Sequence, residues 1–158
     1  MPGKNLQDSA YHLDAIDREI IYMLVDNSKT SLAHIATKVG ISTTAVHQRI
    51  KKLENAEVIE STISILNPRK IGYKVVAFVS VSLVQPSYYN EVIELLQDVN
   101  EVVEAHYTTG NHSLFIKVIC RDNEHLLDVL TKIQHIKAIE KTETFISLDQ
   151  KILRQLKV

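Results

Sequence analysis

One stretch of the sequence combines basic side chains with a complete lack of acidic ones. Between Asn27 and Leu53 there is no Asp or Glu, and the basic residues of that stretch are Lys29, Lys38, Arg49, Lys51 and Lys52. A local field of one sign favours contact with the phosphates of a nucleic acid. The whole chain has a formal net charge of -1. Any such affinity must therefore come from local placement rather than from global charge.

The polar residues of this stretch have the spacing of one exposed helix face. With Val46 turned toward a core and about 100° of rotation per residue, Thr44 and Gln48 point the opposite way. Gln48 could pair with adenine through two hydrogen bonds, and Thr44 could contact a thymine methyl group. Lysines are suited to phosphates, which set affinity rather than sequence preference. The candidate DNA-binding residues are Ser42, Thr43, Thr44, His47, Gln48, Arg49, Lys51 and Lys52.

Several members of this set have a second interpretation that the sequence leaves open. Lys51 and Lys52 could form an ordinary solvated face, and His47 could be a surface histidine without a partner. Arg49 lies closer to the apolar stripe than the others do. It could contact phosphate, or it could form an ion pair with an acid of the preceding helix.

Three helices are predicted to position these side chains, over residues 15–26, 32–39 and 43–55. Asp14, Ser31 and Ser42 are suitable N-caps, and each directly precedes a stretch with helical apolar spacing. Gly40 allows the positive φ that reverses the chain after a helix. This pattern predicts a winged-type helix-turn-helix domain, which is a DNA-reading unit, in residues 1–60.

A β-branched segment follows the third helix. Val58–Leu66 is partly alternating and ends at Asn67-Pro68, so it predicts a strand within a linker and hinge of residues 61–72. Such a strand alone would be an unpaired edge. We therefore expect it to pair with a symmetry mate or with the following domain.

Residues 73–158 contain a β-α-β arrangement that occurs twice. Strands are predicted at residues 74–84, 102–109, 112–120 and 139–148, with helices at 88–98 and from 122 onward, and a short final helix is possible at 150–156. The order is that of a ferredoxin-like βαββαβ fold, so the chain as a whole is classed as α+β. The first strand is apolar on both faces, which favours dimerisation through the sheet.

The sequence gives little indication of catalysis, metal binding or cofactor binding. The single cysteine, Cys120, alternates with apolar residues and is expected to be a core residue in a reducing cytosol. His106 and His112 could face each other across a hairpin, more plausibly as surface residues than as metal ligands. No phosphate loop, nucleophile elbow or dinucleotide motif is present, so we expect no cofactor, no metal and no enzymatic activity. No run is apolar enough for a membrane span, and a cytoplasmic location is expected.

The order of these motifs resembles the Lrp/AsnC (feast/famine) family of transcriptional regulators. The resemblance covers about residues 13–148 and rests on Leu13-Asp14-x-x-Asp17, Val39-Gly40-Ile41-Ser42, Val46-x-x-Arg49-Ile50, Asn67-Pro68-x-x-Ile71-Gly72 and Thr109-Gly110. It implies a sequence-specific regulator that binds double-stranded DNA. The second domain, called RAM in that family, would form homodimers that assemble further, often into octamers.

The resemblance also implies an effector site at the hairpin between the second and third strands. The residues expected there are Thr109, Gly110, Asn111, His112 and Ser113. The family hairpin usually reads Gly-Asp-Tyr-Asp, whereas the residues here are Gly-Asn-His-Ser, so both acids are missing. An amino acid or related metabolite is the expected effector. The alternative is a ligand-independent architectural protein of the same family that wraps DNA.

Overall fold

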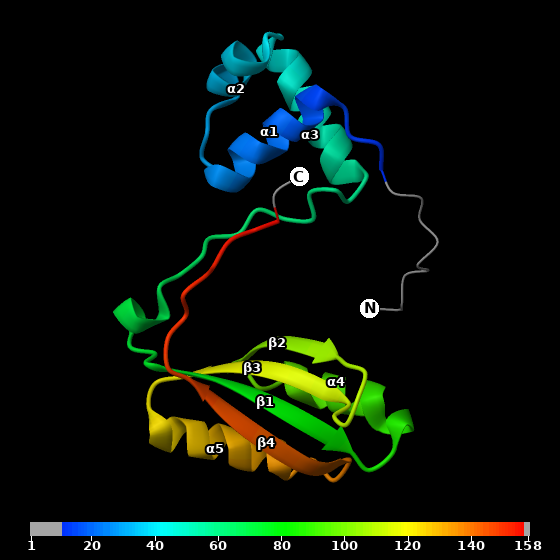
Figure 1. Cartoon of the computed structure of the whole chain (residues 1–158), viewed down its shortest axis with the longest axis vertical. Coiled ribbons are helices and arrows are strands. Elements are labelled where there is room, and N and C mark those ends of the chain that lie inside the picture. The colour runs from blue at the N-terminus through cyan, green and yellow to red at the C-terminus, as the bar shows by residue number, and fades with distance from the viewer. Residues whose placement is uncertain (1–10, 157–158) are drawn as a thin grey trace. The chain divides into compact units, whose positions relative to one another are not determined.

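The computed structural model describes residues 11–156, which divide into two compact units. The first unit contains the chain up to Ile65 together with the segment that begins at Leu153, and the second unit contains Leu66–Ile152. The first unit is helical and the second combines a sheet with helices (Figure 1).

The first unit consists of helices α1 (Ala15–Asp26), α2 (Leu32–Val39) and α3 (Thr43–Asn55). The Ser31 and Ser42 hydroxyl oxygens accept hydrogen bonds from backbone N–H groups in the first turns of α2 and α3. Gly40 has a φ of 72°, which allows the tight turn between α2 and α3. The predicted helix-turn-helix is therefore confirmed.

Apolar side chains from all three helices form the core of this unit. Ile20 of α1, Ile35 of α2, and Val46 and Leu53 of α3 are fully buried. Each of these side chains contributes about 1.5–3 kcal/mol through burial. The described residues of this unit include no β-hairpin, so the wing expected from the sequence is absent from this part of the chain.

The linker differs from its prediction. Residues 58–66 do not form a strand, because no other strand of the described chain pairs with them. Their backbone lacks the ladder of hydrogen bonds that defines a strand. Ile63, Ile65 and Leu66 each leave about two thirds of their surface exposed. The predicted strand was therefore wrong, because a β-branched pattern forms a strand only where a partner strand is available.

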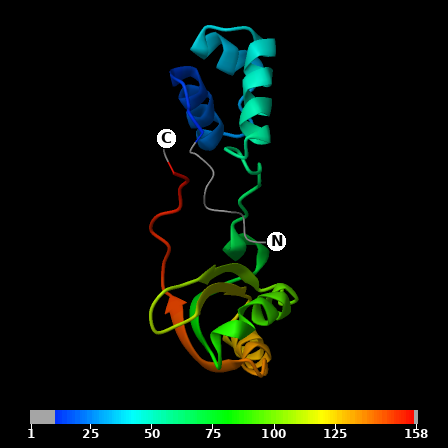
Figure 2. The same cartoon turned by 90° about the vertical axis from the view of Figure 1, so that its right-hand side faces the viewer.

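The second unit is a four-stranded antiparallel sheet with two helices. Its strands are β1 (Val75–Leu83), β2 (Val102–Tyr107), β3 (Leu114–Cys120) and β4 (Ile139–Ser147), arranged in the order β2-β3-β1-β4. Helices α4 (Tyr89–Gln97) and α5 (Asn123–Gln134) lie on one face of the sheet (Figure 2). Short 3-10 helices occur at Pro68–Ile71 and Pro86–Tyr88. The predicted ferredoxin-like topology is confirmed.

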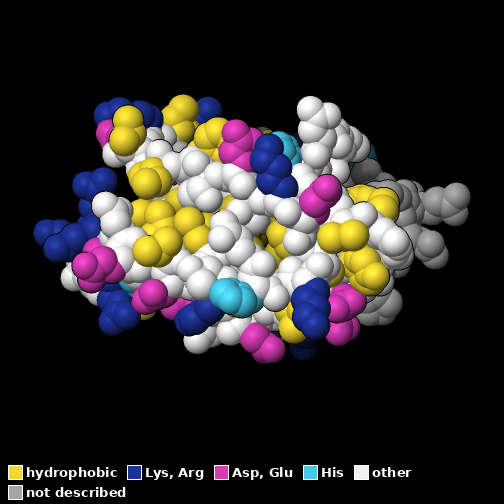
Figure 3. Space-filling view, turned by 90° about the horizontal axis from the view of Figure 1, so that it is seen from below, with side chains coloured by type: hydrophobic (Ala, Val, Ile, Leu, Met, Phe, Trp, Pro, Cys, Tyr) yellow, Lys and Arg dark blue, Asp and Glu magenta, His cyan; other side chains and the backbone are white. Residues whose placement is uncertain are grey.

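The two faces of the sheet have different surroundings. The face toward the helices carries the buried core, including Val79, Ile116 and the predicted Cys120. On the opposite face Phe78 stacks on Phe115 with ring centroids 5.8 Å apart, and Phe78 lies opposite Phe145 in the register with β4. Phe145 is 50% exposed. The space-filling view shows hydrophobic side chains at the surface among charged ones (Figure 3).

The C-terminal segment also differs from its prediction. Residues 150–156 form no helix. A segment of seven residues is too short to form a helix alone, because the cost of the first turn is not repaid below about 12 residues. No helix among the described residues has the length and apolar character needed to cross a membrane.

Candidate DNA interface and ligand loop

Helix α3 presents one polar face to solvent. Val46 and Leu53 fix the opposite face in the core at 0% exposure. The predicted contact residues that lie exposed are Ser42, Thr43, Thr44, His47, Gln48, Lys51 and Lys52. In addition, the hydroxyl oxygen of Ser42 accepts a hydrogen bond from the Ala45 N–H at 3.1 Å, so it caps the helix. The N-terminal half of α3 is thus exposed to solvent.

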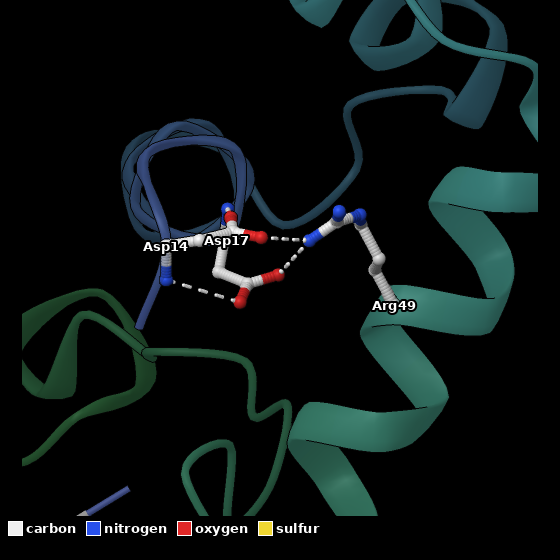
Figure 4. A network of polar contacts seen from close by, with 3 residues as sticks. All are labelled: Asp14, Asp17 and Arg49. Carbon is white, nitrogen blue, oxygen red and sulfur yellow. Dashed lines mark hydrogen bonds and ion pairs between the residues drawn. The ribbon is translucent and has the colours of Figure 1, made fainter. Parts of the chain in front are cut away.

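Arg49 is the exception within the predicted set. One terminal nitrogen of its guanidinium lies 2.6 Å from an Asp14 carboxylate oxygen and 2.7 Å from an Asp17 carboxylate oxygen (Figure 4). The Arg49 side chain is 32% exposed and the Asp17 side chain only 10%. The sequence left open whether Arg49 contacts phosphate or forms an ion pair with an acid of α1. In the structure Arg49 forms the ion pair.

The two aspartates are themselves linked at the start of α1. The Asp17 N–H donates to the Asp14 carboxylate at 2.7 Å, and the Asp14 N–H donates to the Asp17 carboxylate at 3.3 Å. This capping box orients both carboxylates toward Arg49. The Arg49 bridge therefore fixes the beginning of α1 against α3 and sets the orientation of the exposed face.

Acid is expected to weaken this connection. The N–H of Asp17 and the guanidinium of Arg49 hold the pKa of Asp14 below its ordinary value of 3.8. A lowered pKa stabilises the folded state above the unfolded value and loses this contribution as pH falls through the folded value. We expect an NMR titration to show Asp14 titrating below pH 3.8. An Asp14 titration at or above 3.8 in the folded protein would contradict the bridge.

Lys52 lies beside an aromatic residue. Its ammonium nitrogen is 5.7 Å from the ring centroid of Tyr11, which precedes α1. An aromatic ring at this distance attracts a cation weakly when the pair is exposed. The Lys52 ammonium therefore lies on the side of α3 that faces Tyr11.

Replacement of Lys52 by alanine is expected to weaken binding to all DNA sequences alike. A lysine on a phosphate releases about one counterion, so the slope of log affinity against log salt should become shallower by about one. Affinities measured at several salt concentrations on one DNA fragment check this result. Lys137→Ala, in the second unit, is the control and should leave the slope unchanged. An unaltered slope for Lys52→Ala would remove this residue from the phosphate contacts.

The connection between β2 and β3 is wider than the tight turn predicted at Gly110-Asn111. It spans residues 108–113 and is closed by the Thr108 N–H, which donates to the Ser113 carbonyl at 3.0 Å. The Thr108 hydroxyl donates to the His112 carbonyl at 2.8 Å. Gly110 has a φ of 109°, a conformation that favours glycine. The predicted effector residues Thr109–Ser113 all lie on this loop.

His112 brings two residues to the loop that the sequence did not indicate. Its Nδ1 atom lies 3.2 Å from the Ser82 hydroxyl of β1, and its Nε2 atom lies 3.6 Å from a Glu143 carboxylate oxygen of β4. His106 instead lies near Glu104 and is not paired with His112. Among residues 11–156, no group of His, Cys, Asp and Glu could hold a metal ion. The pairing of β1 with β3 places Ser82 beside the loop, and the pairing of β1 with β4 places Glu143 next to it, so no local motif could have revealed either residue.

Cys120 and the adjacent polar pair serve the fold. Burial raises the pKa of the Cys120 thiol to about 11, so it stays protonated at neutral pH. His125 at the start of α5 lies 2.9 Å from the Glu101 carboxylate, and both side chains are mostly buried. This pair ties α5 to the loop before β2.

Comparison with known proteins places both units in one family. Residues 13–54 match the AsnC-type helix-turn-helix domain, and residues 76–156 match the Lrp/AsnC ligand-binding domain. The regulatory protein AsnC of Haemophilus influenzae is 39% identical over 148 residues, which cover 93% of this chain and 99% of that protein.

Solved structures agree with this relationship. The structure of AsnC from Escherichia coli has a TM-score of 0.88 at 38% identity and covers 94% of this chain and 100% of that one. A transcriptional regulator of Neisseria meningitidis, solved as a complex with L-Met, shares the fold with a TM-score of 0.85 at 19% identity, covering 90% and 94% of the two chains. Because the family models span both units and the relatives are regulators rather than enzymes, the chain is a member of the Lrp/AsnC family of DNA-binding transcriptional regulators.

Proposed function

We propose that this regulator reads DNA through the exposed face of α3, with its N-terminal half in the major groove. Thr44, His47 and Gln48 contact base edges, while Lys51 and Lys52 contact phosphates. Ser42 and Thr43 lie at the start of the helix, near the backbone of the DNA. Arg49 does not contact DNA in this proposal, because its guanidinium is engaged by Asp14 and Asp17.

The observation that carries this proposal is the division of α3 into two faces. One face is fully buried at Val46 and Leu53, and the opposite face is polar, basic and exposed. The residues from 27 to 53 contain no acid that would repel phosphates. Residues 1–60 form the DNA-reading part in this proposal, 61–72 the linker, and 73–158 the effector and oligomerisation part.

We further propose that the protein acts in the cytoplasm as a homodimer that assembles into a higher oligomer, such as an octamer. The sheet face opposite α4 and α5 supports dimerisation, because it exposes Phe115 and Phe145 and carries the half-buried Phe78 that stacks on Phe115. Two-fold pairing of reading helices suits two half-sites one DNA turn apart.

A footprinting experiment tests the arrangement on DNA. Genomic fragments retained by the purified protein should show paired protected half-sites with centres about 10 base pairs apart, or a multiple of that spacing. Light scattering of the free protein should give a mass of at least two chains. A monomer that protects a single, unpaired half-site would contradict the proposal.

The effector proposal places a small molecule, such as an amino acid, at the loop of residues 109–113. The support is the match to a ligand-binding domain and the L-Met that the Neisseria meningitidis protein binds. One observation favours the ligand-independent alternative, since Gly110–Ser113 include no acid. A ligand that binds only the folded form must raise the melting temperature, so a thermal-shift screen of amino acids separates the two possibilities.

A further inference from the structure

A second stretch without acidic residues surrounds the turn before β1. Residues 61–90 contain no Asp or Glu, and their basic residues are Arg69, Lys70 and Lys74. All three are exposed. Within residues 11–156 no acid forms an ion pair with any of them. Their charges are therefore available to an anion from outside the chain.

The backbone of this turn is held by its own hydrogen bonds. Arg69 and Lys70 lie on the 3-10 helix Pro68–Ile71, the single coil ahead of β1 in Figure 1. The Asn67 side-chain oxygen accepts from the Arg69 N–H at 3.1 Å and from the Lys70 N–H at 3.4 Å. Gly72 ends the helix with a φ of 94°. Because the turn is already ordered, binding a ligand there costs less conformational entropy.

Lys74 adds a like-charged neighbour at the end of the sheet. Its N–H donates to the Cys120 carbonyl at 3.0 Å and to the Arg121 carbonyl at 3.2 Å, so Lys74 and Arg121 lie opposite each other. Like charges in that arrangement repel. The Arg121 Nε atom donates to the His125 ring, and Asp122 accepts from the His125 N–H as the cap of α5. An anion bound beside Lys74 would relieve the repulsion.

DNA is the polyanion that a regulator of this family binds, and lysine and arginine suit its phosphates. The chain from Asn55, the last residue of α3, to Arg69 can span at most about 50 Å. That length corresponds to about 15 base pairs of duplex. The chain therefore allows the turn to reach DNA beyond the bases that α3 would read.

We propose that Arg69, Lys70 and Lys74 form a second DNA contact, which binds phosphates of the DNA that flanks the half-site. We call these three residues the basic turn. Phosphate contacts carry no sequence information, so the basic turn adds affinity and salt dependence but no base preference. The inference goes beyond the proposed reading by α3, because it concerns DNA outside the half-site.

The test compares two duplexes that carry the same operator. The short duplex ends at the operator, and the long duplex extends it by about 15 base pairs on each side. The full-length protein should bind the long duplex more tightly and with a steeper slope of log affinity against log salt. The double variant Arg69→Ala/Lys70→Ala should make the slope on the long duplex shallower by about two for each chain bound. On the short duplex it should bind as the wild type does.

Two further double variants are the controls. Lys132→Ala/Lys137→Ala removes two exposed cations of the same unit and should keep the wild-type slope on both duplexes. Arg69→Lys/Lys70→Arg preserves both charges and should also keep it. The melting temperature of Arg69→Ala/Lys70→Ala should equal that of the wild type, because both residues are exposed.

Two results would overturn the inference. One is a wild-type slope that is the same on the short and long duplexes. The other is an Arg69→Ala/Lys70→Ala variant with the wild-type slope on the long duplex. A failure of the proposed α3 reading has a different signature, since the short operator would then be bound no better than random DNA of the same length.

Discussion

Replacement of Arg49 by alanine is expected to lower the free energy of unfolding of the first unit by about 2 kcal/mol. The cost arises because the Asp17 carboxylate, whose side chain is only 10% exposed, would lose its charged partner at 2.7 Å. Removal of one member of a fully buried pair costs about 3–5 kcal/mol. The smaller value applies here because the Arg49 side chain is 32% exposed and partly solvated.

Urea unfolding followed by a signal from the helices of the first unit measures this change. Lys51→Ala is the matched control, since Lys51 is an exposed cation of the same helix and should change stability by less than about 0.5 kcal/mol. Arg49→Lys should recover only part of the loss, because an ammonium is more strongly hydrated than a guanidinium and is therefore less easily held beside the mostly buried Asp17 carboxylate. If Arg49→Ala were as stable as the wild type, α1 would not be held to α3 by this bridge.

Replacement of Gln48 by alanine is expected to reduce discrimination between DNA sequences by about 1–3 kcal/mol at one base position. That range is typical of a side chain that makes two hydrogen bonds to a base. The affinity for random DNA should change little, because Gln48 carries no charge and makes no phosphate contact in our proposal. The measurement is a set of binding titrations on one operator and its single-base variants.

Lys51→Ala provides the contrast for this experiment. It should weaken every operator variant by a similar factor, because phosphate contacts do not depend on sequence. With Gln48→Ala, one of the single-base changes in the operator should no longer weaken binding. The other base changes should weaken binding as much as they do for the wild type. The same preference among all variants before and after the Gln48 change would assign base reading to another residue.

The helices of the first unit could be predicted to the residue because local signals determine them. Asp14, Ser31 and Ser42 cap the helices, and Gly40 adopts the positive φ that its position suggested. The ferredoxin-like order of strands and helices could also be predicted from the sequence. Each strand and helix has its own apolar periodicity, and right-handed crossovers leave few alternative topologies.

Features that depend on distant residues could not be derived in the same way. The linker at 58–66 has strand-forming residues, yet its strand would need a partner that local sequence cannot supply. The role of Arg49 stayed open until the packing of α1 on α3 brought Asp14 and Asp17 within reach. Glu143 and Ser82 reach the ligand loop only through the order of strands in the sheet.

We propose above all that the exposed face of α3 reads a DNA sequence. The most direct test is the affinity of the purified protein for a selected genomic fragment and for random DNA of equal length, at two salt concentrations. At physiological salt we expect the selected fragment to bind at least about 10³-fold more tightly than random DNA. Equal affinity for both DNAs at physiological salt would contradict it, because binding would then rest on charge alone.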